Sequence, residues 1–183
     1  NMLVQTIFSA LAAATIATAA NQNHTASIAN DNPAGAAYMA RLPDRPDTTI
    51  RGNITAVTDP DGNGVLFAVD LEGLPMEGGP FPYHIHDHPV PSDGNCTGTL
   101  AHLDPWQRGE TPPCDANAPA TCQVGDLAGK HGKAKAPTFA DSYTDLYTSL
   151  QQGKGAFFGN RSITIHFANT TRITCANFTL IAS

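Results

Sequence analysis

The sequence contains 183 residues, of which 41% are hydrophobic and 14% are charged, and its formal net charge is −6 at pH 7. This size and composition are typical of one soluble globular domain. The ten lysine and arginine residues are scattered along the chain, which argues against nucleic acid as a partner because a phosphate backbone requires a basic surface.

The N-terminal segment has the pattern of a targeting sequence. Residues 2–20 form an uncharged, apolar, alanine-rich run that ends in small residues, as in a secretory signal peptide, although no cationic start precedes it. A disordered or anchoring N-terminus is the alternative. We expect residues 1–20 to be a signal peptide, residues 21–35 to be a flexible lead-in, and residues 36–183 to form one β domain.

From residue 36 the sequence favours strands. Apolar residues alternate with polar ones, as at Val65, Phe67 and Val69, and such alternation predicts half-buried strands. The sequence DPDGNG between two of these runs predicts a hairpin turn. The predicted strands cover residues 36–43, 48–58, 64–74, 80–90, 160–169 and 171–182.

A long irregular segment separates the first four predicted strands from the last two. Residues 89–138 are rich in proline, glycine, asparagine and aspartate, and a loop of this length is uncommon unless it is functional or pinned. Residues 139–153 are consistent with a short helix or an irregular turn. Cys96, Cys114 and Cys122 lie inside the irregular segment, so disulfides can pin it. We expect an all-β, antiparallel Greek-key β-sandwich or flattened barrel of about eight strands with a long disulfide-pinned loop.

The cysteines and the glycosylation motifs both indicate secretion. The chain has four cysteines, an even number, which predicts two disulfides in an oxidising compartment, and three pairings are possible. Six N-x-[ST] motifs without proline are candidate glycosylation sites, which begin at Asn23, Asn53, Asn95, Asn160, Asn169 and Asn177.

Three of the seven histidines occur at alternate positions in the sequence YHIHDHPVP. On a strand, His84, His86 and His88 would share one face, where they could bind a metal or simply be solvated. His102 follows in the loop and His166 lies on a late strand, which a Greek-key return can bring beside the earlier one. Four imidazoles from three segments suit copper or zinc.

The histidine motifs resemble those of the copper/zinc superoxide dismutase family. The resemblance rests on YHIHDHPVP for the first ligand pair, CTGTLAHLDP for a loop cysteine and the next ligand, QVGDLAGKHG for the end of the metal loop, ITIHF for the last ligand, and TTRITCANF for an arginine and the second cysteine. These five motifs follow the family's order along residues 83–178. The resemblance implies dismutation of superoxide, with superoxide anion as the substrate.

The family pattern implies a role for each matching residue. It makes Arg172 the guanidinium beside an open copper position and His102 a ligand that also donates a proton. His88 has no counterpart, so we expect it to be a surface residue. The implied copper ligands, one copper per chain, are His84, His86, His102 and His166, and the implied disulfides are Cys96 with Cys175 and Cys114 with Cys122.

Two departures from the two-metal enzymes change the expected chemistry. In the two-metal enzymes, zinc is held by a histidine shared with copper, two more histidines and an aspartate. Here Gln123 precedes the VGD motif and no histidine lies between it and His102, so only Asp126 remains besides the shared imidazole. These ligands are too few for a closed four-ligand zinc site. Only five residues separate His166 from Arg172, which predicts a solvent-open copper. These features resemble those of the secreted fungal copper-only superoxide dismutases, and this resemblance implies that the protein binds no zinc.

Without zinc, another group must hold the second nitrogen of the His102 ring. We expect Asp126 to accept this hydrogen bond, because metal-bound imidazoles usually donate to a carboxylate or carbonyl. The copper-only family often has a glutamate where this chain has Gln123, so the support of the copper ligand and the activity are expected to differ.

Two other functions remain open. One is a copper-binding or copper-buffering surface protein on the same scaffold with little dismutase activity, which Gln123 favours. The other is an immunoglobulin-like adhesion module whose histidines are incidental. For the favoured function we expect a secreted monomer associated with the cell wall or cell surface.

Overall fold

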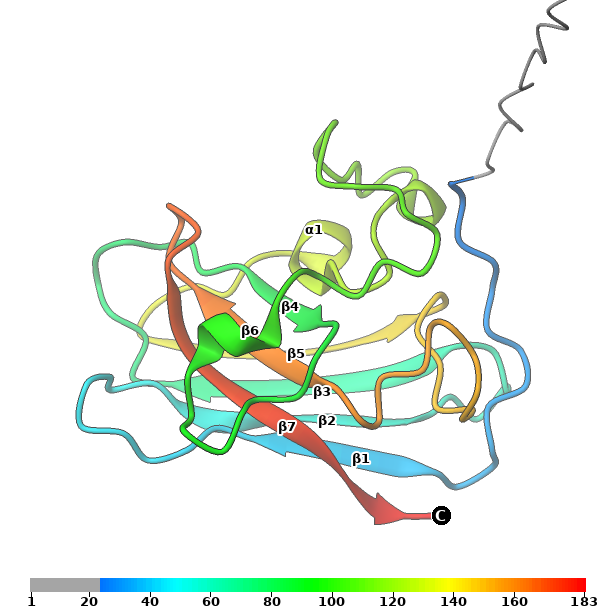
Figure 1. The fold of residues 1–183 in the computed structure, drawn as a ribbon, viewed down its shortest axis with the longest axis horizontal. Helices are drawn as coiled ribbons and strands as arrows, with labels where there is room; N and C mark the ends of the chain where they lie inside the picture. Colours follow the sequence, from blue (N-terminus) through cyan, green and yellow to red (C-terminus); the bar gives the residue numbers. More distant parts are fainter. Residues whose placement is uncertain (1–23) are drawn as a thin grey trace, which may run out of the picture.

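The computed structural model describes residues 24–183, in which seven strands form one antiparallel sheet with little helix (Figure 1). The predicted all-β class is therefore confirmed. The predicted signal peptide at residues 1–20 and the motif at Asn23 lie outside the described residues. The elements are β1 (Ala37–Arg41), β2 (Arg51–Thr58), β3 (Val65–Glu72), β4 (Tyr83–His86), α1 (Leu127–His131), β5 (Thr138–Asp145), β6 (Ser162–His166) and β7 (Arg172–Ala182).

The strand order in the sheet is β4-β6-β7-β1-β2-β3-β5. The first three strands form the predicted meander, and the chain then crosses from β3 to β4 at the far end of the order. The sheet is strongly curled, and the long loop with α1 covers β4 (Figure 1). This crossing places β4 beside β6, although some 75 residues of sequence separate them.

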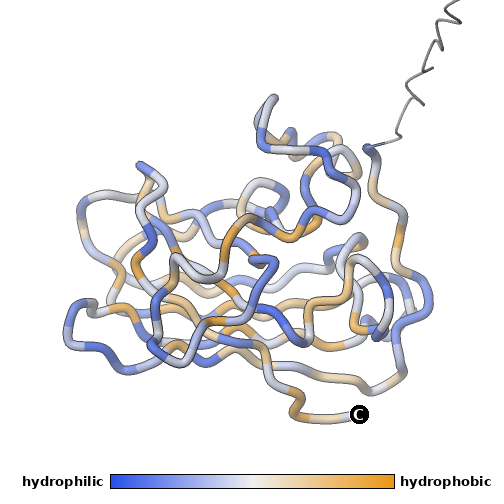
Figure 2. Tube along the Cα trace, in the orientation of Figure 1, coloured by the Kyte–Doolittle hydropathy of each residue, from blue (hydrophilic) through white to orange (hydrophobic). Residues whose placement is uncertain are grey.

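Alternating apolar residues build the core between the curled parts of the sheet. Val65, Phe67 and Val69 on β3 are buried, as their spacing predicts. On β4, Tyr83 and Ile85 are also fully buried. Because side chains alternate across a strand, His84 and His86 must point to the opposite, outer face of β4. Hydrophilic residues gather in the loops around this core (Figure 2).

The prediction of a short helix or irregular turn at residues 139–153 is wrong in its first half, because β5 extends the sheet beside β3. This edge strand has mostly exposed polar residues, and the inward position at its end is occupied by a carboxylate, Asp145. An edge strand with so few apolar residues has no clear period-two signal.

A buried ion pair joins α1 to the end of β5. Lys130 Nζ lies 2.5 Å from Asp145 Oδ2, His131 Nε2 lies 2.8 Å from the same oxygen, and both Lys130 and Asp145 are almost completely buried. Burial alone would raise the pKa of Asp145, but the charge of Lys130 and the hydrogen bond from His131 bring it below its ordinary value. Lys130 also donates to Val124 O at 2.8 Å, so the pair holds the segment that precedes α1.

Residues 24–35, which belong to the predicted flexible lead-in, lie against the domain. They contain no strand or helix, but Ala26 N donates to Ala120 O and Ala29 N donates to Leu146 O, each at 2.8 Å. The Asn32 side chain also accepts from Leu150 N at 2.7 Å. Backbone hydrogen bonds, which composition does not reveal, therefore attach this segment to the domain.

Two disulfides pin the long loop, in the pairing that the family resemblance implied. Cys96 is joined to Cys175 on β7, and Cys114 is joined to Cys122 within the loop. Between residues 24 and 183, no helix is long and apolar enough to cross a membrane.

The Lys130 and Asp145 pair generates a stability prediction. Lys130→Met should lower the free energy of unfolding by about 3 kcal/mol, because it leaves Asp145 buried without its main countercharge. The matched control is Lys135→Met at an exposed position, which should change stability by less than about 0.5 kcal/mol. Urea unfolding followed by circular dichroism measures both values. Equal stability of the two variants would show that the buried pair is not needed.

Candidate metal centre

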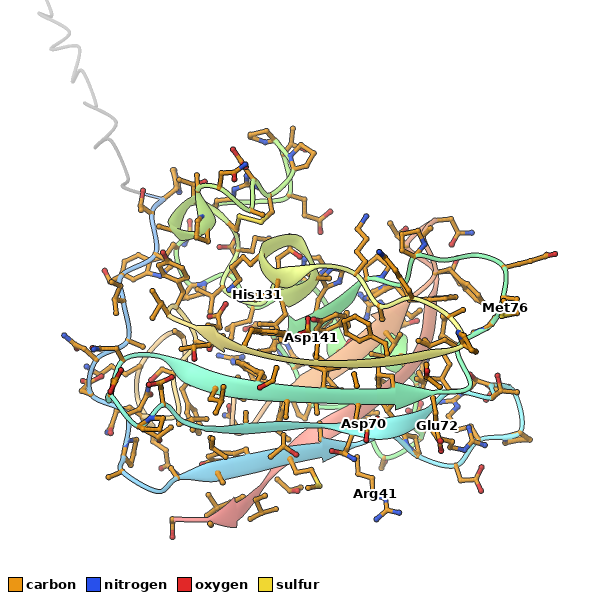
Figure 3. All side chains as sticks on the ribbon, turned by 180° about the vertical axis from the view of Figure 1, so that it is seen from behind. Arg41, Asp70, Glu72, Met76, His131 and Asp141 are labelled. Atoms are coloured by element: carbon orange, nitrogen blue, oxygen red, sulfur yellow. A yellow bond between two sulfur atoms is a disulfide. The ribbon has the colours of Figure 1, made fainter. Side chains whose placement is uncertain are left out.

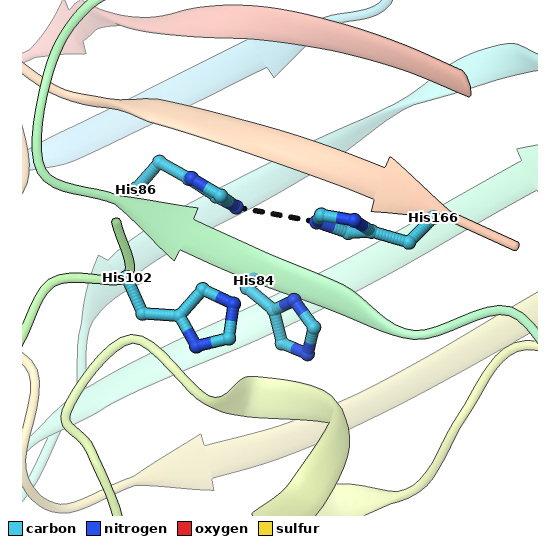
Figure 4. A group of neighbouring side chains, drawn as sticks. All are labelled: His84, His86, His102 and His166. Atoms are coloured by element: carbon cyan, nitrogen blue, oxygen red, sulfur yellow. Dashed lines mark hydrogen bonds between the residues drawn. The ribbon is translucent and has the colours of Figure 1, made fainter. Parts of the chain in front are cut away.

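Four imidazoles converge on the outer face of the sheet (Figure 4). His84 and His86 come from β4, His166 from the end of the neighbouring β6, and His102 from the loop that pairs with His86. One ring nitrogen of each histidine lies within 4.8 Å of the corresponding nitrogens of the others. His86 Nε2 and His166 Nε2 are 3.2 Å apart. The structure thus brings together all four histidines that the family pattern implied, whereas His88 is exposed beyond the end of β4.

Three of the rings are oriented by hydrogen bonds from Nδ1. His86 Nδ1 lies 2.9 Å from Leu100 O, and His166 Nδ1 lies 2.9 Å from Thr170 O. His102 Nδ1 lies 2.7 Å from Gln123 Oε1. A carbonyl oxygen can only accept, so each Nδ1 carries the proton in the neutral ring. The lone pair of each Nε2 is therefore free to bind a metal.

The fourth ring, that of His84, has the opposite orientation. Its Nδ1 is buried and has no hydrogen-bond partner in the part of the chain that the structure describes. Its Nε2 lies 3.5 Å from Asp126 Oδ1. Buried polar atoms are nearly always satisfied, so an orphaned Nδ1 beside three free Nε2 atoms indicates an absent ligand. The donor set fits a metal ion that prefers four imidazole nitrogens.

The surroundings keep these rings neutral, which is the form that binds metal. Burial, followed by the nearby His102 and His166 rings, holds the pKa of His84 well below its usual range. Burial and the neighbouring His102 lower the pKa of His86 to about 3. Burial also lowers the pKa of His166. No proton therefore has to leave these three rings when a metal binds near neutral pH.

Backbone contacts explain how the loop reaches the strand. Leu103 N donates to Ile85 O at 2.9 Å, Ile85 N donates to Gly125 O at 2.9 Å, and Gly125 N donates to Leu103 O at 2.8 Å. A Cβ at position 125 would lie 2.2 Å from Ile85 O, so only glycine permits this approach. These bonds place His102 and Gln123 beside β4.

The imidazoles line a cavity of about 260 Å³ that also includes Pro82, Leu100, Ala101, Glu110, Thr170 and Arg172. Arg172 begins β7 directly opposite His166, so the sheet register places its side chain beside the ligands. Its guanidinium donates to neutral oxygens of the loop, which are Cys96 O, Thr97 O, Thr99 Oγ1 and Leu100 O. Leu100 O thereby contacts both His86 and Arg172. The position of Arg172 agrees with the expected guanidinium beside the site.

The expected partner of His102 was wrong. Gln123 Oε1 accepts from the ring, and the Gln123 amide nitrogen donates to Asp104 Oδ2 at 3.2 Å, which fixes the amide orientation. Asp126 instead accepts from Gly129 N at 2.8 Å as the N-cap of α1 and faces His84. Aspartate is a strong N-cap, so the start of the helix determines where this carboxylate points.

The sequence interpretation also missed contributors to the site. The carbonyls of Leu100 and Thr170 orient two rings, and both residues have positive φ angles, 59° and 73°. Non-glycine residues in this region are strained and cluster at functional sites, but no sequence motif marks them. Glu110 lines the cavity from the loop and had no pattern to identify it. His131, beside Asp145, takes no part in the four-histidine cluster.

Comparison with known proteins gives consistent relatives, although no protein-family model matches the chain. The chain is 45% identical to the cell surface Cu-only superoxide dismutase of Arthroderma benhamiae, over 82% of this chain and 48% of that protein. It is 40% identical to the cell surface Cu-only superoxide dismutase 5 of Candida albicans, over 85% of this chain and 66% of that protein. The chain therefore spans about half to two thirds of the length of these relatives.

A solved structure agrees with these relatives. Candida albicans superoxide dismutase 5 in its Cu(II) form superposes with a TM-score of 0.74 at 38% identity, and the match covers 80% of this chain and 93% of that chain. The fold and the curl of the sheet are thus shared with a copper protein.

The hydrogen bond between His102 and Gln123 generates a binding prediction. Gln123→Leu should weaken copper affinity by about 10–100-fold, because it removes the acceptor that orients His102 while retaining side-chain volume. The control is Gln152→Leu at an exposed position. Competition with a chelator of known affinity measures both dissociation constants. Unchanged affinity in Gln123→Leu would mean that the ring needs no such support.

Proposed function

The chain belongs to the fungal copper-only superoxide dismutase family, and we propose that it converts superoxide to oxygen and hydrogen peroxide with one copper ion per chain. The proposed copper ligands are His84 through Nδ1 and His86, His102 and His166 through Nε2. The observation that carries this proposal is the convergence of four imidazoles within metal-binding distance of one another, with the buried Nδ1 of His84 left unsatisfied. Copper, when bound, supplies the one-electron redox chemistry that zinc lacks.

Arg172 is proposed to bind and orient the superoxide anion. Its guanidinium lines the cavity and is fixed by several loop oxygens, so little side-chain freedom is lost when an anion binds. A hydrogen bond from a guanidinium to an anion is charge-assisted and stronger than a neutral one. Arginine also keeps its charge at all physiological pH values.

His102 is proposed to handle a proton that the product requires. Gln123 Oε1 holds its Nδ1–H, so the ring can accept and donate a proton only at Nε2, the nitrogen that faces the cavity. Histidine is the side chain that most commonly transfers protons in catalysis.

We propose that the protein holds no zinc. Asp126 is occupied as the helix cap, and the four histidines are the one cluster of three or more histidine, cysteine or acidic residues found within residues 24–183 that could hold a metal. A structural zinc site requires four protein ligands, and none remain beside Asp126 for it. We further propose that the copper site is open to solvent, since the β6–β7 turn is short.

The proposed location is the cell surface or cell wall, reached by secretion with residues 1–20 as the signal peptide. The names of the relatives and the two disulfides support this proposal. Asn95, Asn160, Asn169 and Asn177 are exposed, and Asn53 is partly buried. Asn177 is a weaker candidate for glycosylation than the other exposed asparagines, since its amide nitrogen already donates to Val90 O. We propose that the protein is a monomer.

A second function, copper binding or buffering with little dismutation, is favoured by one observation. The group that holds His102 is a neutral amide, which cannot stabilise a positively charged imidazole as a carboxylate would. Dismutation needs His102 to take up a proton in each cycle, whereas copper storage does not. Metal analysis together with pulse radiolysis of the copper-loaded protein separates the two functions.

Arg172 is the residue whose replacement distinguishes catalysis from storage. Arg172→Ala should retain near-normal copper content, because none of the four ligands is changed, but should lower the dismutation rate by at least about tenfold. Arg172→Lys should lose less, since charge survives without the fork geometry. Copper content and pulse radiolysis at matched loading measure these effects, with Arg41→Ala at an exposed position as the control. Equal rates for wild type and Arg172→Ala would favour the storage function.

A further inference from the structure

Two charged side chains other than the histidines line the metal cavity, and they have opposite signs. Arg172 is on its β7 wall, and Glu110 is on the disulfide-pinned loop. Arg172 donates only to neutral oxygens, and no hydrogen bond or ion pair of Glu110 is found among residues 24–183. The two charges therefore do not neutralise each other by contact. An anion that enters the cavity is subject to both.

The charges of Arg172 and Glu110 both influence the pKa of a histidine in the cluster. Burial is the main effect that lowers the pKa of His166, and among the smaller effects the charge of Arg172 lowers it and the charge of Glu110 raises it. Glu110 is exposed, so its effect is partly screened by water and depends on ionic strength. Because Glu110 makes no hydrogen bond or ion pair among the described residues, its replacement by glutamine changes mainly the charge at the cavity wall.

The repulsion from a carboxylate scales with the charge of the incoming anion. For two unit charges about 10 Å apart in water, Coulomb's law gives an effect of about twofold on binding, and therefore about fourfold for a dianion. A guanidinium that binds superoxide also fits phosphate, since its fork matches two oxygens. With Arg172 alone, an open cavity would favour dianions over monoanions.

We propose that Glu110 is a specificity-determining residue, which excludes multiply charged anions such as hydrogen phosphate from the cavity more strongly than singly charged ones such as superoxide. This proposal rests on the proposed function, because it assumes a copper site whose substrate is a monoanion. Glu110 weakens the binding of every anion to Arg172, but the loss of binding free energy is twice as large for a dianion as for a monoanion. Compared with a cavity that contains Arg172 alone, Glu110 thereby shifts the relative binding of superoxide and phosphate about twofold toward superoxide.

The test uses the Cu(II)-loaded protein and its Glu110→Gln variant. Azide, a monoanion, is titrated by its charge-transfer absorption with copper, and phosphate is titrated as a competitor at about pH 8, where it is mostly a dianion. In a buffer of low ionic strength, Glu110→Gln should bind azide about twofold and phosphate about fourfold more tightly than wild type. At about 1 M salt both ratios should approach one, since the screening length falls to about 3 Å.

The matched control is Glu72→Gln, which removes the same charge from the end of β3 (Figure 3). Glu72 does not line the metal cavity. This variant should bind both anions as wild type does. The proposal would be overturned if Glu110→Gln and Glu72→Gln had the same dissociation constants for azide and for phosphate. It would also be overturned if Glu110→Gln tightened the binding of both anions by the same factor. If wild type fails to bind copper and shows no azide band, the proposed function fails, and this inference fails with it.

Discussion

The metal centre depends on the hydrogen bonds that hold the Nδ1 atoms of three histidines. Each bond joins a ring to a carbonyl oxygen, and each leaves the Nε2 lone pair directed at one shared point. Without these acceptors, the rings could rotate and the neutral tautomers would mix. The orientation of these three rings is thus fixed by neutral backbone and side-chain amide oxygens. His84 completes the set with its opposite nitrogen.

The loop that carries these oxygens must itself be rigid. Leu100 and Thr170 hold their carbonyls in place at positive φ angles, which cost free energy for residues other than glycine. The Cys96–Cys175 disulfide and the contacts of Arg172 with the loop oxygens offset this cost by tying the first part of the loop to β7. Arg172 therefore contacts the loop that orients His86, which the disulfide ties to β7 independently, and it also presents a positive charge to the cavity.

The sequence predicts some parts of this protein well and others poorly, for physical reasons. The strand alternation around Phe67 and the histidine motifs are local patterns, so they could be interpreted directly. The β5 strand could not, because an edge strand with a buried Asp145 lacks the apolar period on which such predictions depend. The choice between Gln123 and Asp126 depends on where a helix cap directs a carboxylate, and the part played by Glu110 depends on how a loop folds back. Both are properties of tertiary structure.

The short connection between β6 and β7 has two consequences that belong together. In this turn, Phe167 N donates to Thr171 O at 2.8 Å, and Thr170 N donates to Phe167 O at 2.9 Å. The tight turn places no long segment of its own over the cavity, which supports the proposal that the site is open to anions in the medium. It also fixes the register in which His166 faces Arg172, so ligand and guanidinium keep a constant separation. If the site is open as proposed, discrimination among anions falls to the charges on the cavity wall, Arg172 and Glu110.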